Sequence, residues 1–169
     1  MRPTFLVIDI IYIQKKNMTN FIHIISRALY IDQGHILVCK IDGRDHNIYH
    51  FLPGGHVEIG ESAQAALIRE LQEEIGHHFR VDRFLGVLEN KFDRPNGAFQ
   101  HEYTFHYLVS CPTLKYGQDI VQLESHIKPI WVPLSSLDTI DFRPTAILPH
   151  VSRWLKSDDA YTFISTMEK

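Results

Sequence analysis

The sequence predicts an α/β fold in which a mixed β-sheet packs between helices. Two observations predict this class. Strand-like apolar segments alternate with short turns through most of the chain, and only one central and one C-terminal segment have helical character. Strands interrupted by a central helix and closed by a terminal one are typical of a sheet covered on both faces. At 169 residues, the chain is long enough to bury a hydrophobic core as one domain.

The strands are predicted from apolar runs that end at turn residues. Phe21–Ile31 and His35–Ile41 flank the turn Asp32-Gln33-Gly34 and are expected to form a hairpin. A strand at Ile127–Val132 is expected at an edge or a bulge, because Pro129 has no backbone N–H to donate. Other expected strands are Ile48–Leu52, Arg80–Glu89 and Glu102–Ser110, with loops at Asp42–Asn47 and Lys91–Gln100.

The clearest helix is predicted between Ser62 and Ile75. Ser62 can cap its N-terminus, and Gly76 is suited to the position just past its end. A second helix is expected after Pro144, through Trp154 and Leu155. The apolar residues of the first helix recur every four positions, at Ala63, Leu67, Leu71 and Ile75.

The N-terminal segment, residues 1–18, is interpreted as an extension or an extra strand without a catalytic role. Its apolar run, Phe5–Ile13, is too short to span a bilayer. The recognisable pattern begins just after Met18, an alternative translation start, so residues 19–169 are expected to form one domain. A homodimer is a further expectation, since an apolar strand in this segment can pair with a second copy.

Composition excludes some classes of partner. The net charge of −3 gives no general positive field, so long nucleic acid is not expected to bind, nor is a membrane. The only cysteines, Cys39 and Cys111, lie in apolar runs, which favours buried thiols and a reducing cytoplasmic location.

Three carboxylates on the predicted helix carry the chemical signal. At 100° per residue, Glu70, Glu73 and Glu74 fall within one third of the helix circumference, beside the apolar stripe. Like charges this close repel one another. A solvated acidic surface is one interpretation, and a site for a hard divalent cation is the other. The preceding Gly54-Gly55 turn favours the cation, because a backbone carbonyl without a neighbouring Cβ can approach it closely.

This stretch resembles the Nudix box, a glycine, five residues, a glutamate, seven residues, then Arg-Glu-aliphatic-any-Glu-Glu-any-Gly-aliphatic. The box extends over Gly55–His77, and His77 is its one departure, at a position that is usually aliphatic. The residues that match are Gly55, Glu61, Arg69, Glu70, Leu71, Glu73, Glu74 and Gly76.

The resemblance to the Nudix hydrolase superfamily (MutT-like) implies an α/β/α sandwich and roles for individual residues. Glu70, Glu73 and Glu74 would bind Mg²⁺, with Mn²⁺ as a substitute, and the Gly55 carbonyl would be a further ligand. Glu70 or Glu74 would also orient or deprotonate the attacking water, and the sequence does not choose between them. Arg69 and Glu61 would brace the loop against the helix. Glu102, beyond the box, is the candidate for an extra ligand or base, although an exposed strand-end carboxylate is an equal alternative.

Candidate substrate contacts lie outside the box. Arg27 and Lys40 precede it on strands and can reach phosphates, and His56 lies in the turn itself. Phe92 and Arg94 can cover a nucleobase by stacking or by a cation–π contact. Each of these residues also has an ordinary structural interpretation, as a surface cation or a loop residue.

The resemblance implies hydrolysis of a phosphoanhydride bond in a small nucleotide-like substrate. We expect a nucleoside diphosphate linked to another group, of the ADP-ribose or nucleotide-sugar type. One alternative is an oxidised or non-standard nucleoside triphosphate. An alternative of another class is a sensor that binds nucleotides without turnover, although such proteins typically lose box carboxylates that this sequence retains.

Overall fold

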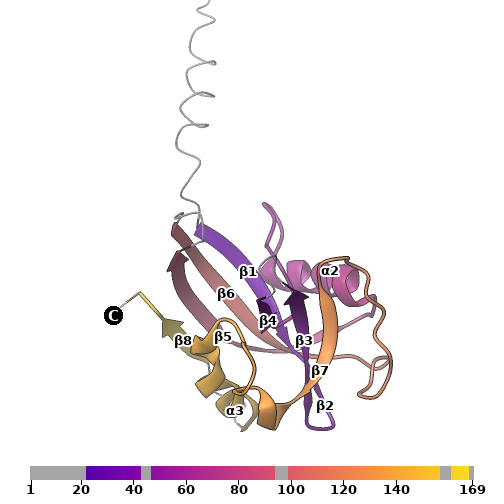
Figure 1. Ribbon diagram of the computed structural model, residues 1–169. Coiled ribbons are helices and arrows are strands. Elements are labelled where there is room, and N and C mark those ends of the chain that lie inside the picture. The colour runs from indigo at the N-terminus through magenta and orange to yellow at the C-terminus, as the bar shows by residue number, and fades with distance from the viewer. Residues whose placement is uncertain (1–21, 43–46, 94–98, 157–160, 168–169) are drawn as a thin grey trace, which may run out of the picture.

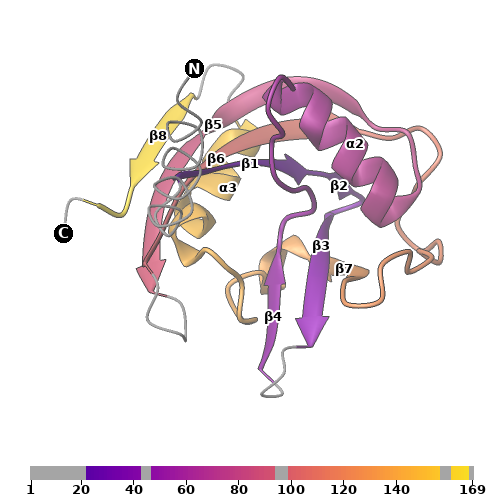
Figure 2. The same cartoon turned by 90° about the horizontal axis from the view of Figure 1, so that it is seen from above.

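The computed structural model describes residues 22–42, 47–93, 99–156 and 161–167, which form two sheets and two α-helices (Figures 1 and 2). The predicted extension, residues 1–18, lies outside the described residues. The strands are β1 (Ile22–Leu29), β2 (Ile31–Asp32), β3 (His35–Asp42), β4 (Ile48–Phe51), β5 (Arg80–Asp93), β6 (Phe99–Ser110), β7 (Lys128–Pro133) and β8 (Thr162–Ser165). The helices are α2 (Ala63–Ile75) and α3 (Leu148–Lys156), with 3-10 turns η1 (Leu134–Ser136) and η2 (Thr145–Ile147).

The first sheet is mixed and has the strand order β1-β6-β5-β8. β6 pairs parallel with β1 and antiparallel with β5, and β8 pairs parallel with β5. The second sheet is antiparallel, with β3 at its centre between β7 and the strands β4 and β2. Because β7 pairs only with β3 among the described strands, Pro129 lies on an edge strand, as the sequence predicts.

Helix α2 packs on one face of the mixed sheet. Ser62 caps it by accepting a hydrogen bond from the Ala65 N–H, and Gly76 ends it in the left-handed conformation, as predicted. Leu67, Leu71 and Ile75 are buried, so the predicted apolar stripe faces the sheet. Their cluster also includes Ala28, Tyr30, Leu37, Phe79, Tyr107, Val109, Cys111 and Leu114.

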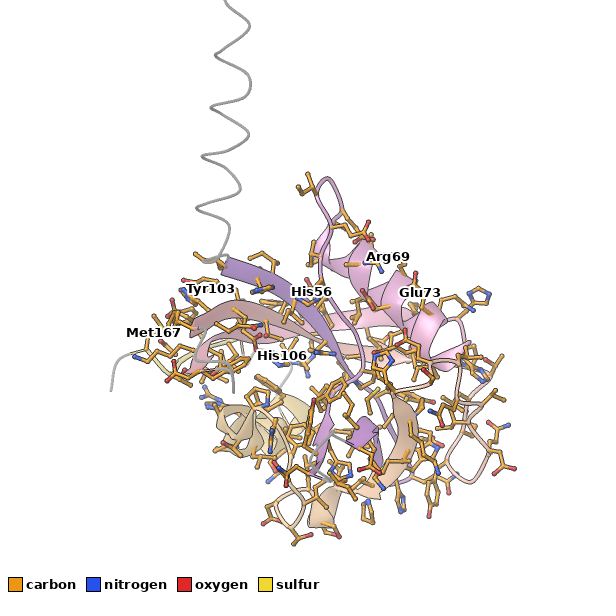
Figure 3. The ribbon with its side chains drawn as sticks, turned by 45° about the horizontal axis from the view of Figure 1, so that its top comes forward. His56, Arg69, Glu73, Tyr103, His106 and Met167 are labelled. Carbon is orange, nitrogen blue, oxygen red and sulfur yellow. The ribbon has the colours of Figure 1, made fainter. Side chains whose placement is uncertain are left out.

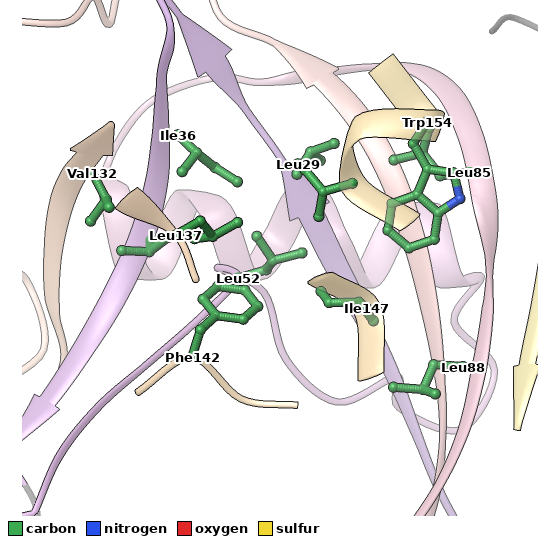
Figure 4. Close-up of a cluster of buried hydrophobic side chains, with 12 residues drawn as sticks. Leu29, Ile36, Leu52, Leu85, Leu88, Val132, Leu137, Phe142, Ile147 and Trp154 are labelled. Atoms are coloured by element: carbon green, nitrogen blue, oxygen red, sulfur yellow. The ribbon is translucent and has the colours of Figure 1, made fainter. Parts of the chain in front are cut away.

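Helix α3 closes a second core on the opposite face of this sheet. Trp154 is fully buried there and packs with Leu85 and Leu88 of β5 (Figure 4). Its indole N–H donates to the Thr162 hydroxyl, which ties the helix to β8. Since the two helices cover opposite faces of the mixed sheet, the predicted α/β/α arrangement is confirmed. The second sheet contributes Ile36, Val38 and Val132 to this core. The other members are Leu29 at the end of β1, Leu52 just after β4, and Leu137, Phe142, Ile147 and Val151.

The predicted hairpin between Phe21–Ile31 and His35–Ile41 is correct only at its tip. β2 pairs with the start of β3, but β1 pairs with β6 in the other sheet. The chain changes sheets at Tyr30, whose buried hydroxyl donates to the carbonyls of Cys111 and Leu114. A buried tyrosine hydroxyl needs such partners, and they fix the bend that divides the predicted strand.

Two further expectations are corrected. The predicted loop Lys91–Gln100 is too long, because Lys91–Asp93 still pairs with Phe99–His101 in the β5–β6 ladder. β8 was not predicted at all, since its four residues have little pattern apart from the apolar pair Phe163 and Ile164. Among the described residues, no helix is both long enough and apolar enough to cross a membrane.

If α3 seals the second core, then Trp154→Ala should lower the free energy of unfolding by about 3–5 kcal/mol, the cost of emptying a buried aromatic site. Chemical denaturation measures this loss. The control is Leu155→Ala, one residue along the helix at a side chain that is 38% exposed. Equal, small losses for both variants would contradict the packing described.

Candidate active site

The loop between β4 and α2 lies along β1, which fixes its position over the sheet. Its backbone completes three hydrogen bonds with that strand, each 2.9 Å long. They run from the Ser26 N–H to the Gly55 carbonyl, from the Ala28 N–H to the Pro53 carbonyl, and from the Val57 N–H to the Ile24 carbonyl.

Two glycines allow this loop to approach its neighbours closely. Gly54 has φ +121°, and a Cβ there would lie 2.2 Å from the Ser26 carbonyl oxygen. A Cβ on Gly55 would lie 2.3 Å from the carboxyl carbon of Glu70. The backbone of the turn is therefore in contact with a helix carboxylate, an approach that only glycine permits.

Glu74 lies directly beneath this turn. Its side chain is buried, and one oxygen accepts a hydrogen bond of 2.8 Å from the Gly54 N–H. Burial raises the pKa of Glu74 to about 7, against the opposing effects of Arg27 and of the Gly54 hydrogen bond. A carboxylate that is costly to ionise in this place is suited to a bound cation, which supplies the missing positive charge.

Arg69 joins the loop to the helix carboxylates. It donates to Glu61 through two nitrogens, each at 3.0 Å, and to the His56 carbonyl at 3.0 Å. It also contacts Glu70 at 2.9 Å and Glu73 at 3.3 Å. The structure thus contains the contact between Arg69 and Glu61 that the sequence predicts, and this contact lowers the pKa of Glu61. Figure 3 shows Arg69 and Glu73 on the helix, with His56 between them and the mixed sheet.

The donor set fits a hard divalent cation. The side-chain donors at the turn are carboxylate oxygens, which Mg²⁺ prefers. In the hydrogen bonds found among the described residues, Glu70 uses Oε1, and Glu73 and Glu74 use Oε2, so each keeps a second oxygen for an ion. Among the described residues, no group of three acidic, histidine or cysteine side chains is already close enough together to hold a metal ion. The fit therefore rests on the chemistry of the donors and on the close approach of the Glu70 carboxylate to Gly55.

A cavity of about 720 Å³ opens between the two sheets and the segment from Asp141 to Ile147. Of the residues predicted to contact metal or substrate, Arg27, Phe92 and Glu102 line it. The predicted box ligands Gly55, Glu70, Glu73 and Glu74 are not among its lining residues, and neither are Lys40 and His56. Arg94 lies outside the described residues.

Arg27, the predicted phosphate contact, contacts the backbone of the glycine turn in the structure. Its guanidinium donates to the carbonyls of Leu52 and Gly54 and lies 4.8 Å from the centroid of the Phe51 ring. It therefore supports the glycine turn from the cavity side, while Glu74 accepts from the same turn. One face of the guanidinium is covered by an aromatic ring, which favours its fixed position.

Glu102 enters the cavity from the sheet. It is only 8% exposed, which excludes the alternative of an exposed strand-end carboxylate. It lies opposite His23 on β1 and Asn90 on β5. The negative charges of Glu70 and Glu102 both act to raise the pKa of His56. Burial has the larger effect and lowers the pKa of His56.

Sequence reasoning missed several residues of the cavity. The Arg143 guanidinium lies 4.6 Å from the centroid of the Tyr49 ring and pairs with Asp141. Tyr49 and Phe51 alternate along β4 and face the cavity together, which is a weak signal available in the sequence. The approach of Arg143 has no local signal, because it depends on a contact between distant segments.

Without metal, the burial of Glu74 should make stability depend on pH. Its folded pKa of about 7 lies above the ordinary 4.5. The contribution of Glu74 to the free energy of unfolding is therefore complete below pH 4.5 and is lost as the pH rises through 7. The loss amounts to about 3 kcal/mol. Unfolding free energies measured in a chelator between pH 4.5 and 8 should show this loss relative to Glu74→Gln.

The comparison with Glu74→Gln is needed because His106 gives the free energy of unfolding the opposite dependence on pH. Burial lowers the pKa of His106 from 6.5 to about 3, so its contribution is lost as the pH falls below 6.5. The difference between wild type and variant cancels this effect. Parallel pH profiles for the two proteins would show that Glu74 is not a buried titrating group.

Comparison with known proteins agrees with this geometry. The family model for the Nudix domain matches residues 23–155, which include both core clusters and the glycine turn. The chain is also 26% identical over 149 residues to an ADP-ribose pyrophosphatase from Methanocaldococcus jannaschii, covering 84% of this chain and 83% of that protein.

Solved structures share the fold. A Nudix hydrolase from Nitrosomonas europaea superposes with a TM-score of 0.57 at 22% identity, covering 82% of this chain and 91% of that one. An ADP-ribose pyrophosphatase from Streptococcus suis gives a TM-score of 0.57 at 16% identity, covering 86% of this chain and 99% of that one. At these identities the likeness concerns the fold alone. Because the family model extends over most of the chain and the box residues meet at one turn, this protein belongs to the Nudix family and is a Nudix hydrolase.

Proposed function

We propose that this protein hydrolyses a phosphoanhydride bond in a nucleoside diphosphate linked to another group, with Mg²⁺ as its cofactor and ADP-ribose or a nucleotide sugar as the preferred substrate type. The observation that carries the proposal is the buried Glu74 beneath the glycine turn, beside Glu70 and Glu73 on one helix face. This arrangement offers oxygen donors where an anionic diphosphate needs neutralisation.

The bound Mg²⁺ would neutralise phosphate charge and activate water. The ion would be held by Glu70, Glu73, Glu74 and the Gly55 carbonyl. The contact between Arg69 and Glu61 would hold the loop against the helix. Arg27 would fix the turn through its carbonyl contacts. Glu102 on β6 would either accept the proton of the attacking water or add a ligand.

The cavity provides room for the remainder of the substrate. It is lined by the aromatic side chains of Tyr49, Phe51 and Phe92 and by the Asp141–Arg143 pair. Aromatic walls can stack on a base, and the ion pair offers both a donor and an acceptor to a polar edge. The name of the Methanocaldococcus relative, an ADP-ribose pyrophosphatase, supports the preferred substrate type.

A panel of substrates tests the preference directly. ADP-ribose, nucleotide sugars, dinucleoside polyphosphates and nucleoside triphosphates are incubated with Mg²⁺, and the products are separated by chromatography. Release of two monophosphates from ADP-ribose or a nucleotide sugar, at the highest kcat/KM of the panel, is the expected result. Preferential conversion of a nucleoside triphosphate to a monophosphate would instead support the alternative substrate class.

The metal assignment predicts a strong effect at Glu74. Glu74→Gln keeps the size of the side chain but removes its charge, so Mg²⁺-dependent kcat should fall by about 100-fold or more. The control is Glu58→Gln in the same loop, where the exposed side chain has no assigned role. Wild-type activity of the Glu74 variant would refute the assignment. Tight nucleotide binding without turnover by the wild type would instead favour the sensor alternative.

A cytoplasmic location and a homodimer are also proposed. Cys39 and Cys111 are both free and buried, which is compatible with a reducing compartment. The homodimer rests on the apolar N-terminal segment, which lies outside the described residues.

A further inference from the structure

Two histidines meet beside the glycine turn without a part in the chemistry proposed above. His23 lies on β1 and His56 on the turn, and their nitrogens Nδ1 and Nε2 are 3.1 Å apart. An antiparallel bridge between Ile25 and His56 and the bond from the Val57 N–H to the Ile24 carbonyl hold the two backbones together. The pair is therefore fixed by the main chain rather than by a chance meeting of mobile side chains.

The separation of the two nitrogens suits a shared cation. Two nitrogens bound at about 2.0–2.1 Å to one tetrahedral ion lie roughly 3.3–3.4 Å apart. The observed 3.1 Å is within a few tenths of an ångström of that value, and the rings meet edge-on with their planes at 63°. A shared proton accounts for the same separation when no metal is present, so the experiment must distinguish a proton from a metal.

A carboxylate lies on the same face of the sheet. His23 pairs with Glu102 across the parallel β1–β6 ladder, and paired residues point to the same side. The next pairs along this face are Ile25 with Thr104 and Arg27 with His106, and all four of these residues line the cavity. The alternation therefore places His23 and Glu102 on the cavity face as neighbours.

We propose that His23 and His56 are the imidazole ligands of a second cation site, which takes a transition-metal ion such as Zn²⁺ or Co²⁺ and is completed by the carboxylate of Glu102. Among the described residues, these three side chains do not already surround a common point. The side chain of Glu102 must therefore rotate towards the histidines when the ion binds. Neutral imidazole suits Zn²⁺ and its neighbours, whereas the all-oxygen set on α2 suits Mg²⁺. Binding at this site does not require that the protein hydrolyse any substrate.

The site has a consequence for turnover under the proposed function. Glu102 would be shared between the histidine site and the reaction, and Glu70 also acts on His56. An ion held by the histidines would occupy the Glu102 carboxylate, which would then not be available to the reaction. Zn²⁺ is thus expected to inhibit Mg²⁺-dependent turnover even when Mg²⁺ is in large excess, and this inhibition should weaken in His23→Gln.

A Co²⁺ titration tests the site independently of activity. Untagged protein is titrated in excess Mg²⁺, which saturates the carboxylate set, and the visible absorption of Co²⁺ bound by nitrogen and oxygen ligands is recorded. One equivalent should bind to the wild type. His23→Gln and His56→Gln should each raise the dissociation constant by about tenfold or more, since even the loss of a supporting partner around a metal ligand costs that much.

The matched control is His126→Gln. His126 is an exposed histidine 3.4 Å from a carboxylate oxygen of Glu124, so it pairs with an acid as His23 is proposed to do, but on a different loop. This variant should bind Co²⁺ like the wild type, and thermal unfolding verifies that every variant is folded. Equal Co²⁺ affinity in wild type and His23→Gln would overturn the proposal and leave the pair as a hydrogen bond. A failed substrate panel with His23-dependent Co²⁺ binding would instead refute the proposed function alone.

Discussion

The burial of the Glu74 carboxylate beneath a glycine turn is the constraint on which the rest of this site depends. The carboxylate accepts from the Gly54 N–H, and burial raises its pKa to about 7. An ionised carboxylate in such a place is stable only when positive charge lies close to it. Arg27 supplies part of that charge, and a divalent cation at the box would supply the remainder. The unfavourable burial in the metal-free protein would thus favour binding of the proposed metal ion.

Two arginines hold the loop and the carboxylates of the proposed cation site in position. Arg69 spans Glu61, Glu70 and Glu73 on the solvent side of the turn, and Arg27 holds the turn's carbonyls on the cavity side. Because both are engaged with the protein, they position the carboxylates and the loop. The hydrogen bonds between the loop and β1 connect the turn to the mixed sheet, where Glu102 of β6 pairs with His23 of β1.

Local signals in the sequence were sufficient for the helix and the box. The cap at Ser62, the apolar stripe from Leu67 to Ile75 and the spacing of the glutamates all follow from helical periodicity, which neighbouring residues determine. The exchange between sheets at Tyr30, the contact of Arg143 with Tyr49 and the meeting of His23 with His56 were not predictable in this way. Each depends on how segments distant in the sequence pair or pack, and no periodic pattern records that.

The carboxylates of α2 and the glycine turn are proposed to form one cation site. Crystals grown with Mn²⁺ test it most directly, because the anomalous scattering of the ion locates it without reference to activity. We expect a peak within about 2.0–2.3 Å of oxygens from Glu74 and at least one of Glu70 and Glu73, beside the Gly54-Gly55 turn. Saturating Mn²⁺ that gives no peak there, or binds only at other carboxylates, would contradict it.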